Sequence, residues 1–287
     1  MRLKINFNRQ DYTQAPYWGK SPMLARFVIV GLGGTGGYLF YYLTRLVAAL
    51  KEKAQKEELH MDFQIVIIDS DVVEEKNVVR QNFVAPQDIG KYKVEVLSER
   101  YGNVYDLNIP ARPEEVNNAQ YLIDVLQKSI AGFKPTISCL LGCVDNNRTR
   151  QVFNEAFEKF EGHLVYGDSG NDEWTGQIIF GMKSSEGVIL PPVAHYYPDI
   201  LEDTDKFPSQ LSCQEQAVSS PQNIATNVLA ATQMFALINQ LFTGDGIESY
   251  GVNFEALTGG ARPLFIDEEN LQLTHHVEIY PFELHLF

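Results

Sequence analysis

Residues 27–37 read FVIVGLGGTGG, and this stretch decides the fold. Its first four residues are apolar and mostly β-branched, which predicts a buried strand. Residues 38–59 then carry apolar side chains at helical spacing, and residues 63–68 form a second apolar run that ends at Asp69. Strand, glycine turn, helix and strand make one βαβ unit, so a parallel sheet begins here.

The rest of the chain continues this alternation. The apolar pattern predicts further helices at 93–101, 114–130, 148–160 and 221–242, and strands at 136–144, 163–166, 177–182, 249–254 and 273–280. Residues 183–220 are rich in Pro, Ser, Asp and Glu and lack periodicity, so we expect a long, functional loop there. The pattern predicts one α/β domain over residues 1–287, with a mostly parallel central sheet, helices on both faces and additional antiparallel C-terminal strands.

Composition and charge exclude several classes of protein. The net charge of −14 argues against a nucleic-acid binder, which needs a basic surface to neutralise phosphates. No run of about 18 apolar residues occurs, and residues 1–14 lack the apolar centre of a signal peptide, so we expect a cytoplasmic protein without a membrane span. The three cysteines contain no CxxC pair, which fits a reducing compartment and predicts no structural zinc site.

The glycine turn between the first strand and helix predicts a nucleotide site. Gly31, Gly33, Gly34 and Gly36 allow a tight turn and a close approach of phosphate to the backbone. The helix that follows presents unpaired N–H groups and a partial positive charge to that phosphate. The turn by itself leaves ATP, NAD and FAD open, and a turn that only packs strand against helix is the alternative.

A polar segment at residues 69–82, called the polar string below, follows the second strand. Asp69 and Asp71 come first, and an acid at this strand end suits a ribose hydroxyl. The donors Asn77, Arg80 and Gln81 follow, and Lys93 begins the next helix, so that two cations could stabilise polyphosphate charge. Taken alone, the arginine and the lysine could equally be surface charges.

The motifs G-x-G-G-x-G, D-x-D, N-x-x-R-Q and G-x-x-K, and the segment CVDNNRTR at 143–150 with its D-N-x-x-x-R spacing, occur here in one order. This order resembles the ThiF/MoeB/HesA proteins and ubiquitin-activating enzymes, over residues 26–254 at least. Residues 250–264 are also similar to the tail of bacterial ThiF-type proteins of the PRTRC gene clusters. The resemblance implies a Rossmann-like ThiF/MoeB fold.

The resemblance also implies a reaction: ATP- and Mg²⁺-dependent adenylation of the C-terminal carboxylate of a ubiquitin-like or sulfur-carrier protein, with release of pyrophosphate. Asp145 would hold Mg²⁺ and act in catalysis with Arg80 and Lys93. Arg150 is expected to orient its loop or to pair with an acid. The implied nucleotide contacts are Gly31, Gly33, Gly34, Gly36, Asp69, Asp71, Asn77, Arg80, Gln81, Lys93 and Asn146.

Cys213 lies near the end of the expected long loop, just before the 221–242 helix, where enzymes similar to the ubiquitin-activating type keep the cysteine that accepts the activated carboxylate. The nearby helix N-terminus would lower its pKa and the neighbouring acids would raise it. Transfer to a Cys213 thioester and adenylation without a thioester both stay open, as does an incidental role for this cysteine.

Further expectations concern partners and residues outside these motifs. A homodimer is expected, with a downstream conjugating enzyme possible, while Arg9 only faintly resembles the family's N-terminal arginine. Cys139 and Cys143 are expected to pack in the core, and His275 and His276 to point to opposite faces of a strand. A Rossmann oxidoreductase that binds NAD or FAD, and a non-catalytic partner subunit, are the alternative functions.

Overall fold

The computed structural model describes residues 23–267, apart from 59–60, 79, 84, 130–131, 205, 208–222 and 245. Within these residues the strands form one mixed sheet in the order β3-β2-β1-β4-β5-β6-β8-β9, and β7 pairs with β6 off this path. The strands are β1 (Met23–Val30), β2 (Met61–Ile68), β3 (Ala111–Arg112), β4 (Ile137–Gly142), β5 (Leu164–Asn171), β6 (Thr175–Ser184), β7 (Gly187–Leu190), β8 (Ser249–Glu255) and β9 (Gly260–Phe265).

The sheet is parallel from β3 through β5 and antiparallel from β5 through β9. This arrangement confirms the predicted α/β fold, with antiparallel strands added at the C-terminal end. Residues 24–30 of β1 and all of β4 are buried because helices cover both faces of the sheet, which explains why these strands are mostly apolar.

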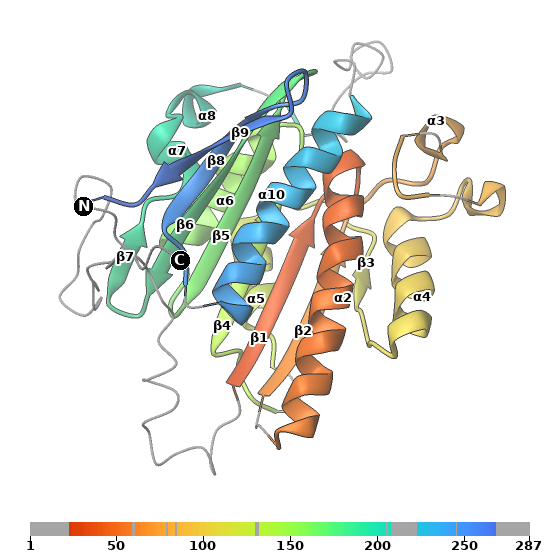
Figure 1. Ribbon diagram of the computed structural model, residues 1–287, viewed down its shortest axis with the longest axis horizontal. Helices are drawn as coiled ribbons and strands as arrows, with labels where there is room; N and C mark the ends of the chain where they lie inside the picture. The colour runs from red at the N-terminus through yellow and green to blue at the C-terminus, as the bar shows by residue number, and fades with distance from the viewer. Residues whose placement is uncertain are drawn as a thin grey trace, which may run out of the picture.

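The helices are α2 (Gly34–Lys56), α3 (Glu75–Val78), α4 (Lys93–Tyr105), α5 (Ala119–Gln127), α6 (Asn147–Lys159), α7 (Val193–Tyr196), α8 (Asp199–Glu202) and α10 (Ile224–Thr243), with a 3₁₀ turn η1 (Pro86–Asp88). Helices α2 and α10 lie side by side on one face of the sheet, and α5 and α6 lie on the other (Figure 1). Large buried side chains fill both layers. Phe27 of β1 contacts the ring of Phe242 in α10 on one side, and Phe153 of α6 contacts Tyr166 of β5 on the other.

The structure corrects part of the expected loop at 183–220. Strand β6 extends to Ser184 and makes a short hairpin with β7, and the helical turns α7 and α8 follow. Elements of four residues are too short for their periodicity to be recognised. Strands β3 and β9 were also not predicted. The expected strand at 273–280 and the residues Arg9, Cys213, His275 and His276 lie outside the described residues.

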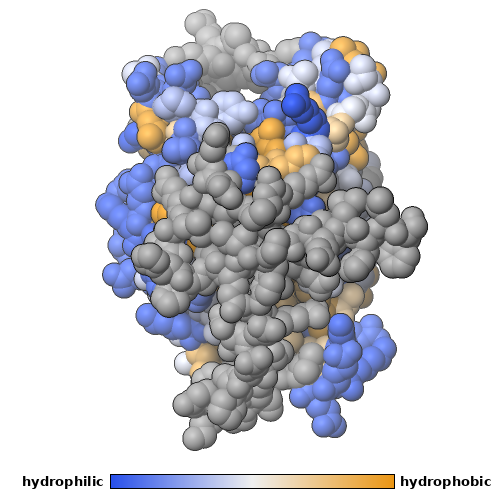
Figure 2. Space-filling view, turned by 60° about the vertical axis from the view of Figure 1, so that its left-hand side comes forward, coloured by the Kyte–Doolittle hydropathy of each residue, from blue (hydrophilic) through white to orange (hydrophobic). Residues whose placement is uncertain are grey.

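The side of the molecule with β7, α7 and α8 is turned forward in Figure 2, where the coloured surface is largely hydrophilic and apolar residues form small groups. Among the described residues, no helix has the length and apolar character needed to span a membrane.

Candidate active site

The predicted site residues follow strands whose ends are level with one another. Val30 of β1 pairs with Ile68 of β2 and Gly142 of β4, and Gly142 pairs with Asp168 of β5. The glycine turn, the string that begins at Asp69, the loop at 143–146 and the end of β5 therefore meet at the carboxyl edge of the parallel strands. Open α/β sheets bind their ligands at this edge.

Two glycines of the turn are required by close packing. Gly31 has a φ of +87°, and a Cβ there would lie 2.6 Å from the carbonyl oxygen of Cys143. A Cβ on Gly36 would lie 1.8 Å from the carbonyl oxygen of Gly31. These contacts bring helix α2 directly against the ends of β1 and β4.

The N-terminus of α2 has no side-chain cap among the described residues. Gly33 is its N-cap and supplies no side-chain hydrogen bond, so the first N–H groups of a 23-residue helix keep their partial positive charge. Among the described residues, a Cβ on Gly33 would have one heavy atom within 4 Å, the side-chain nitrogen of Gln81 at 3.8 Å. An uncapped helix start that the described residues leave uncrowded at Gly33 fits a phosphate group.

Asp69 is bound directly to this turn. Its Oδ2 accepts a hydrogen bond from the Leu32 N–H, and its Oδ1 accepts one of 2.8 Å from the Asp71 N–H. Burial raises the pKa of Asp69, the charge of Lys93 opposes this rise, and the charge of Asp71 adds to it. Because a carboxylate has about four lone-pair sites, acceptor capacity remains for a ribose hydroxyl.

Lys93 forms an ion pair in this structure. Its Nζ lies 2.7 Å from Oδ2 of Asp71, and its side chain is 6 % exposed while that of Asp71 is 61 % exposed. The Lys93 N–H also donates to the Asp71 carbonyl at 3.0 Å, which fixes the first turn of α4 beside the string. Asp71 therefore holds the lysine at the site, and a phosphate would have to share or replace this partner.

Arg80 and Gln81 have polar atoms without partners. The Nε of Arg80 and the Oε1 of Gln81 are buried and make no hydrogen bond with the described residues. Asn77 is buried and uses its Oδ1 to accept the Glu74 N–H at 2.8 Å, so its amide nitrogen is the group left for a ligand. The arrangement brings the string against the glycine turn with donors still available.

Asn82 attaches the string to α2, which the sequence analysis had not predicted. Its Nδ2 donates to the carbonyl of Gly37 at 3.1 Å and to the hydroxyl of Tyr101 at 2.9 Å. The position of Asn82 directly after the N-x-x-R-Q motif could have indicated its role. The side chain acts as a bridge from the string to the helix that begins at the turn.

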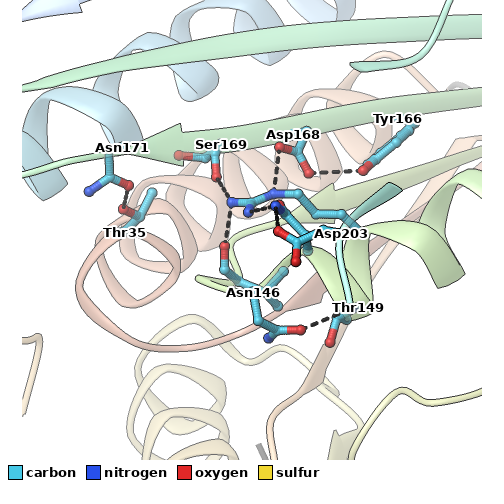
Figure 3. Close-up of polar contacts among 11 residues, drawn as sticks. Thr35, Asn146, Thr149, Tyr166, Asp168, Ser169, Asn171 and Asp203 are labelled. Atoms are coloured by element: carbon cyan, nitrogen blue, oxygen red, sulfur yellow. Dashed lines mark hydrogen bonds and ion pairs between the residues drawn. The ribbon is translucent and has the colours of Figure 1, made fainter. Parts of the chain in front are cut away.

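Asp145 is exposed at the loop after β4. Asn146 is the N-cap of α6, because its Oδ1 accepts the Thr149 N–H at 2.8 Å, so a ligand contact from Asn146 would fall to its amide nitrogen (Figure 3). Among the described residues, no three His, Cys, Asp or Glu side chains are grouped to hold a metal ion. A Mg²⁺ ion that uses one carboxylate would take its other ligands from phosphate and water, as this ion commonly does.

Arg150 holds the Asp145 loop in place, as expected. Its Nη2 donates to the carbonyls of Val144 at 2.7 Å and Ser169 at 3.0 Å, and its Nε lies 3.2 Å from Oδ1 of Asp168. The Tyr166 hydroxyl donates to Asp168 at 2.8 Å (Figure 3). Burial raises the pKa of Asp168, whereas the charge of Arg150 opposes that rise.

The two cysteines of β4 and its following loop are packed as expected. Cys139 is fully buried, and Cys143 contacts the glycine turn. Burial raises the pKa of both thiols, which makes a thiolate unfavourable.

A polar cluster behind the turn was missed by the sequence analysis. The Nδ2 of Asn171, at the end of β5, donates to Oδ1 of Asn227 in α10 at 3.1 Å. The hydroxyl of Thr35 in α2 lies 3.5 Å from Oδ1 of Asn171 (Figure 3). It also lies 3.4 Å from Oδ1 of Asn227. The position of Asn171 at a strand's carboxyl end could have indicated it, whereas nothing local marks the asparagine inside an apolar helix.

A model of the ThiF family matches residues 23–270. The chain belongs to the ThiF family. A search of the curated proteins finds no match. The ThiF fold is shared with the crystal structure of selenomethionine PaaA, at a TM-score of 0.56 and 13 % identity over 87 % of this chain.

The same fold occurs in MccB of E. coli. The crystal structure of MccB with ATP matches at a TM-score of 0.54 and 15 % identity over 84 % of this ThiF-family chain. The crystal structure of MccB with AMPCPP and selenomethionine MccA matches with the same values. The chain spans 65 % of the PaaA chain and 63 % of the MccB chain.

Proposed function

We propose that this ThiF-family protein uses ATP to adenylate the C-terminal carboxylate of a ubiquitin-like or sulfur-carrier protein. The observation that carries the proposal is the uncapped N-terminus of α2 with Asp69 hydrogen-bonded to the turn in front of it. Asp71, Lys93 and Asp145 belong to the same edge of the sheet. The MccB structures with ATP, and with AMPCPP and MccA, support a nucleotide as one substrate of this fold.

The proposed reaction is a displacement at the α-phosphorus of ATP. The carrier's carboxylate oxygen forms a bond to this phosphorus, the bond to the oxygen bridging the α- and β-phosphates breaks, and pyrophosphate leaves. A carboxylate that approaches a polyphosphate is repelled by it, so cations that act where charge develops accelerate the step. Arg80, with its unpartnered Nε, and Lys93, held by Asp71, are the proposed cations.

The other proposed contacts with the nucleotide come from residues at the ends of different strands. The backbone of Gly31, Gly33, Gly34 and Gly36 would take phosphates, and Asp69 would take the ribose. Asp71, Asn77, Gln81 and Asn146 would add polar contacts. Bound at Asp145, Mg²⁺ would supply positive charge to the phosphates.

A thioester step at Cys213 would follow. The thiolate would attack the acyl carbon of the adenylate, a C–S bond would form, and AMP would leave as its C–O bond breaks. The described residues that flank the segment 208–222 support the assignment of Cys213 to this step. Asn147 binds Asp203 at 2.7 Å before it, and Asn227 packs against Gly34 after it, so both flanks are attached at the edge of the proposed site.

A homodimer, a downstream conjugating enzyme and membership of the PRTRC-type subgroup stay predictions. A Rossmann oxidoreductase is the second candidate, because the glycine turn also suits NAD or FAD. That candidate leaves no use for the lysine held by Asp71. Absorbance of a flavin or nicotinamide that copurifies with the protein would favour it.

ATP–pyrophosphate exchange with candidate carriers tests the proposal. Exchange should require the carrier's intact C-terminus and be lost in Asp145→Ala. Glu186, an exposed acid in the β6–β7 hairpin, offers a matched control in Glu186→Ala, which should exchange normally. Covalent capture of the carrier should disappear in Cys213→Ala while exchange persists. Exchange unaffected by Asp145→Ala, or absent with every carrier, would contradict the proposal.

A further inference from the structure

Asn227 of α10 has an unpartnered amide nitrogen beside the glycine turn. The residue is 2 % exposed, and its Oδ1 accepts hydrogen bonds from Asn171 at 3.1 Å and Thr35 at 3.4 Å. Its Nδ2 is buried and makes no hydrogen bond within the described part of the chain. A buried amide nitrogen without a partner costs stability, so its presence calls for a physical reason.

The free nitrogen faces the start of α2. A Cβ built on Gly34, the first residue of α2, would lie 2.0 Å from Nδ2 of Asn227. Glycine at this position therefore lets the amide contact the helix backbone directly. The amide nitrogen carries the positive end of the side-chain dipole, which has the same sign as the helix N-terminus.

The cluster also joins three elements behind the turn. Thr35 belongs to α2 and Asn171 to β5 (Figure 3). Asn227 belongs to α10, which lies beside α2 on the sheet (Figure 1). Because Gly33 provides no side-chain cap, the hydrogen bonds of this cluster help to hold the first turn of α2 in position. The asparagine is thus both a structural contact and a source of positive potential.

We propose that Asn227 is a positioning residue for ATP, which orients the N-terminus of α2 and keeps that end free of negative charge. The inference rests on the proposed function, since it assumes that phosphates bind at this helix end. An aspartate would keep the accepted hydrogen bonds and place an anion against the turn. It should therefore repel phosphates although it preserves the packing.

The test compares Asn227→Ala with Asn227→Asp by calorimetric titration with Mg²⁺-ATP. Asn227→Ala should bind ATP several-fold more weakly than the wild type, and Asn227→Asp at least about tenfold more weakly than the wild type and more weakly than the alanine variant. A merely structural role would give the opposite order, because aspartate retains the contacts. Asn223→Ala is the control, since it removes the α10 cap bond to the Ala225 N–H (2.8 Å) and should leave ATP affinity unchanged.

Each other outcome has a definite meaning. ATP binding by Asn227→Asp equal to or tighter than that of Asn227→Ala overturns the inference, as does an equal loss in Asn223→Ala. If the Asn227 variants do not fold, Thr35→Val removes one hydrogen bond to the cluster, and unchanged ATP affinity in that variant overturns the inference. Absence of ATP binding by the wild type overturns the proposed function, and this inference with it.

Discussion

Loss of Arg150 should leave a buried carboxylate without its partner. Asp168 is 2 % exposed in its side chain and Arg150 is 11 % exposed, so the pair is desolvated. Removing one partner of such a pair costs about 3–5 kcal/mol of unfolding free energy. The variant Arg150→Met should therefore unfold roughly 6 °C or more below the wild type, at about 2–4 °C per kcal/mol.

The same variant should show a particular pH dependence. Burial raises the pKa of Asp168 and Arg150 opposes the rise, so the pKa should rise further in Arg150→Met. The folded state then binds the proton of Asp168 more tightly than the unfolded state does, and its stability falls as the pH rises and the carboxyl ionises. The difference between variant and wild type should be smaller at about pH 5 than at about pH 8.

The assay is urea unfolding at both pH values, with two matched variants. Arg148→Met changes the same residue type two positions earlier on α6, where the guanidinium contacts Gln151 and Phe207 at the surface, and should cost about 1 kcal/mol or less. The double variant Arg150→Met/Asp168→Asn should recover part of the loss, because no buried charge remains although the bonds to the Val144 and Ser169 carbonyls stay broken. Equal losses in the two arginine variants, or no recovery in the double variant, would refute the reasoning.

Three further predictions concern the glycine turn and the start of α6. Gly36→Ala should strongly destabilise the fold, since its Cβ would lie 1.8 Å from the Gly31 carbonyl oxygen, and thermal unfolding would measure this. Gly33→Ala should fold normally but bind ATP about tenfold more weakly in calorimetry, because the methyl group enters the space where a phosphate would sit. Asn146→Ala should lose about 1 kcal/mol of stability in urea unfolding through its N-cap bond to Thr149.

The parallel half of the fold was predictable because its signals are local. Strands β1, β2 and β4 each contain an apolar run, at 27–30, 65–68 and 139–141, and glycines mark the turn that precedes α2. The antiparallel half was less predictable. β7 has four residues and β9 contains Pro263 in a largely exposed strand, so neither gives a clear alternating pattern.

The site also has a part that the sequence could predict and a part that it could not. Asp69, Lys93 and Asp145 stand at fixed places after strands or at helix starts, so their approach to one edge could be expected. The Asp71–Lys93 ion pair and the Asn171–Asn227 hydrogen bond depend on side chains that meet through tertiary packing. The partners are 22 residues apart in the first contact and 56 residues apart in the second. No local sequence pattern links residues so far apart.

The most direct test of the proposed adenylation is intact-mass spectrometry of the carrier protein after incubation with Mg²⁺-ATP and the Cys213→Ala variant, which cannot consume the adenylate by thioester transfer. We predict a carrier that gains one adenylyl group at its C-terminal carboxylate. The gain should be absent with AMPCPP, whose α–β bridge cannot be cleaved to release pyrophosphate, and absent for a carrier that lacks its last residue. Persistent absence of the adenylate with every candidate carrier, while calorimetry shows ATP bound, would contradict the proposed function.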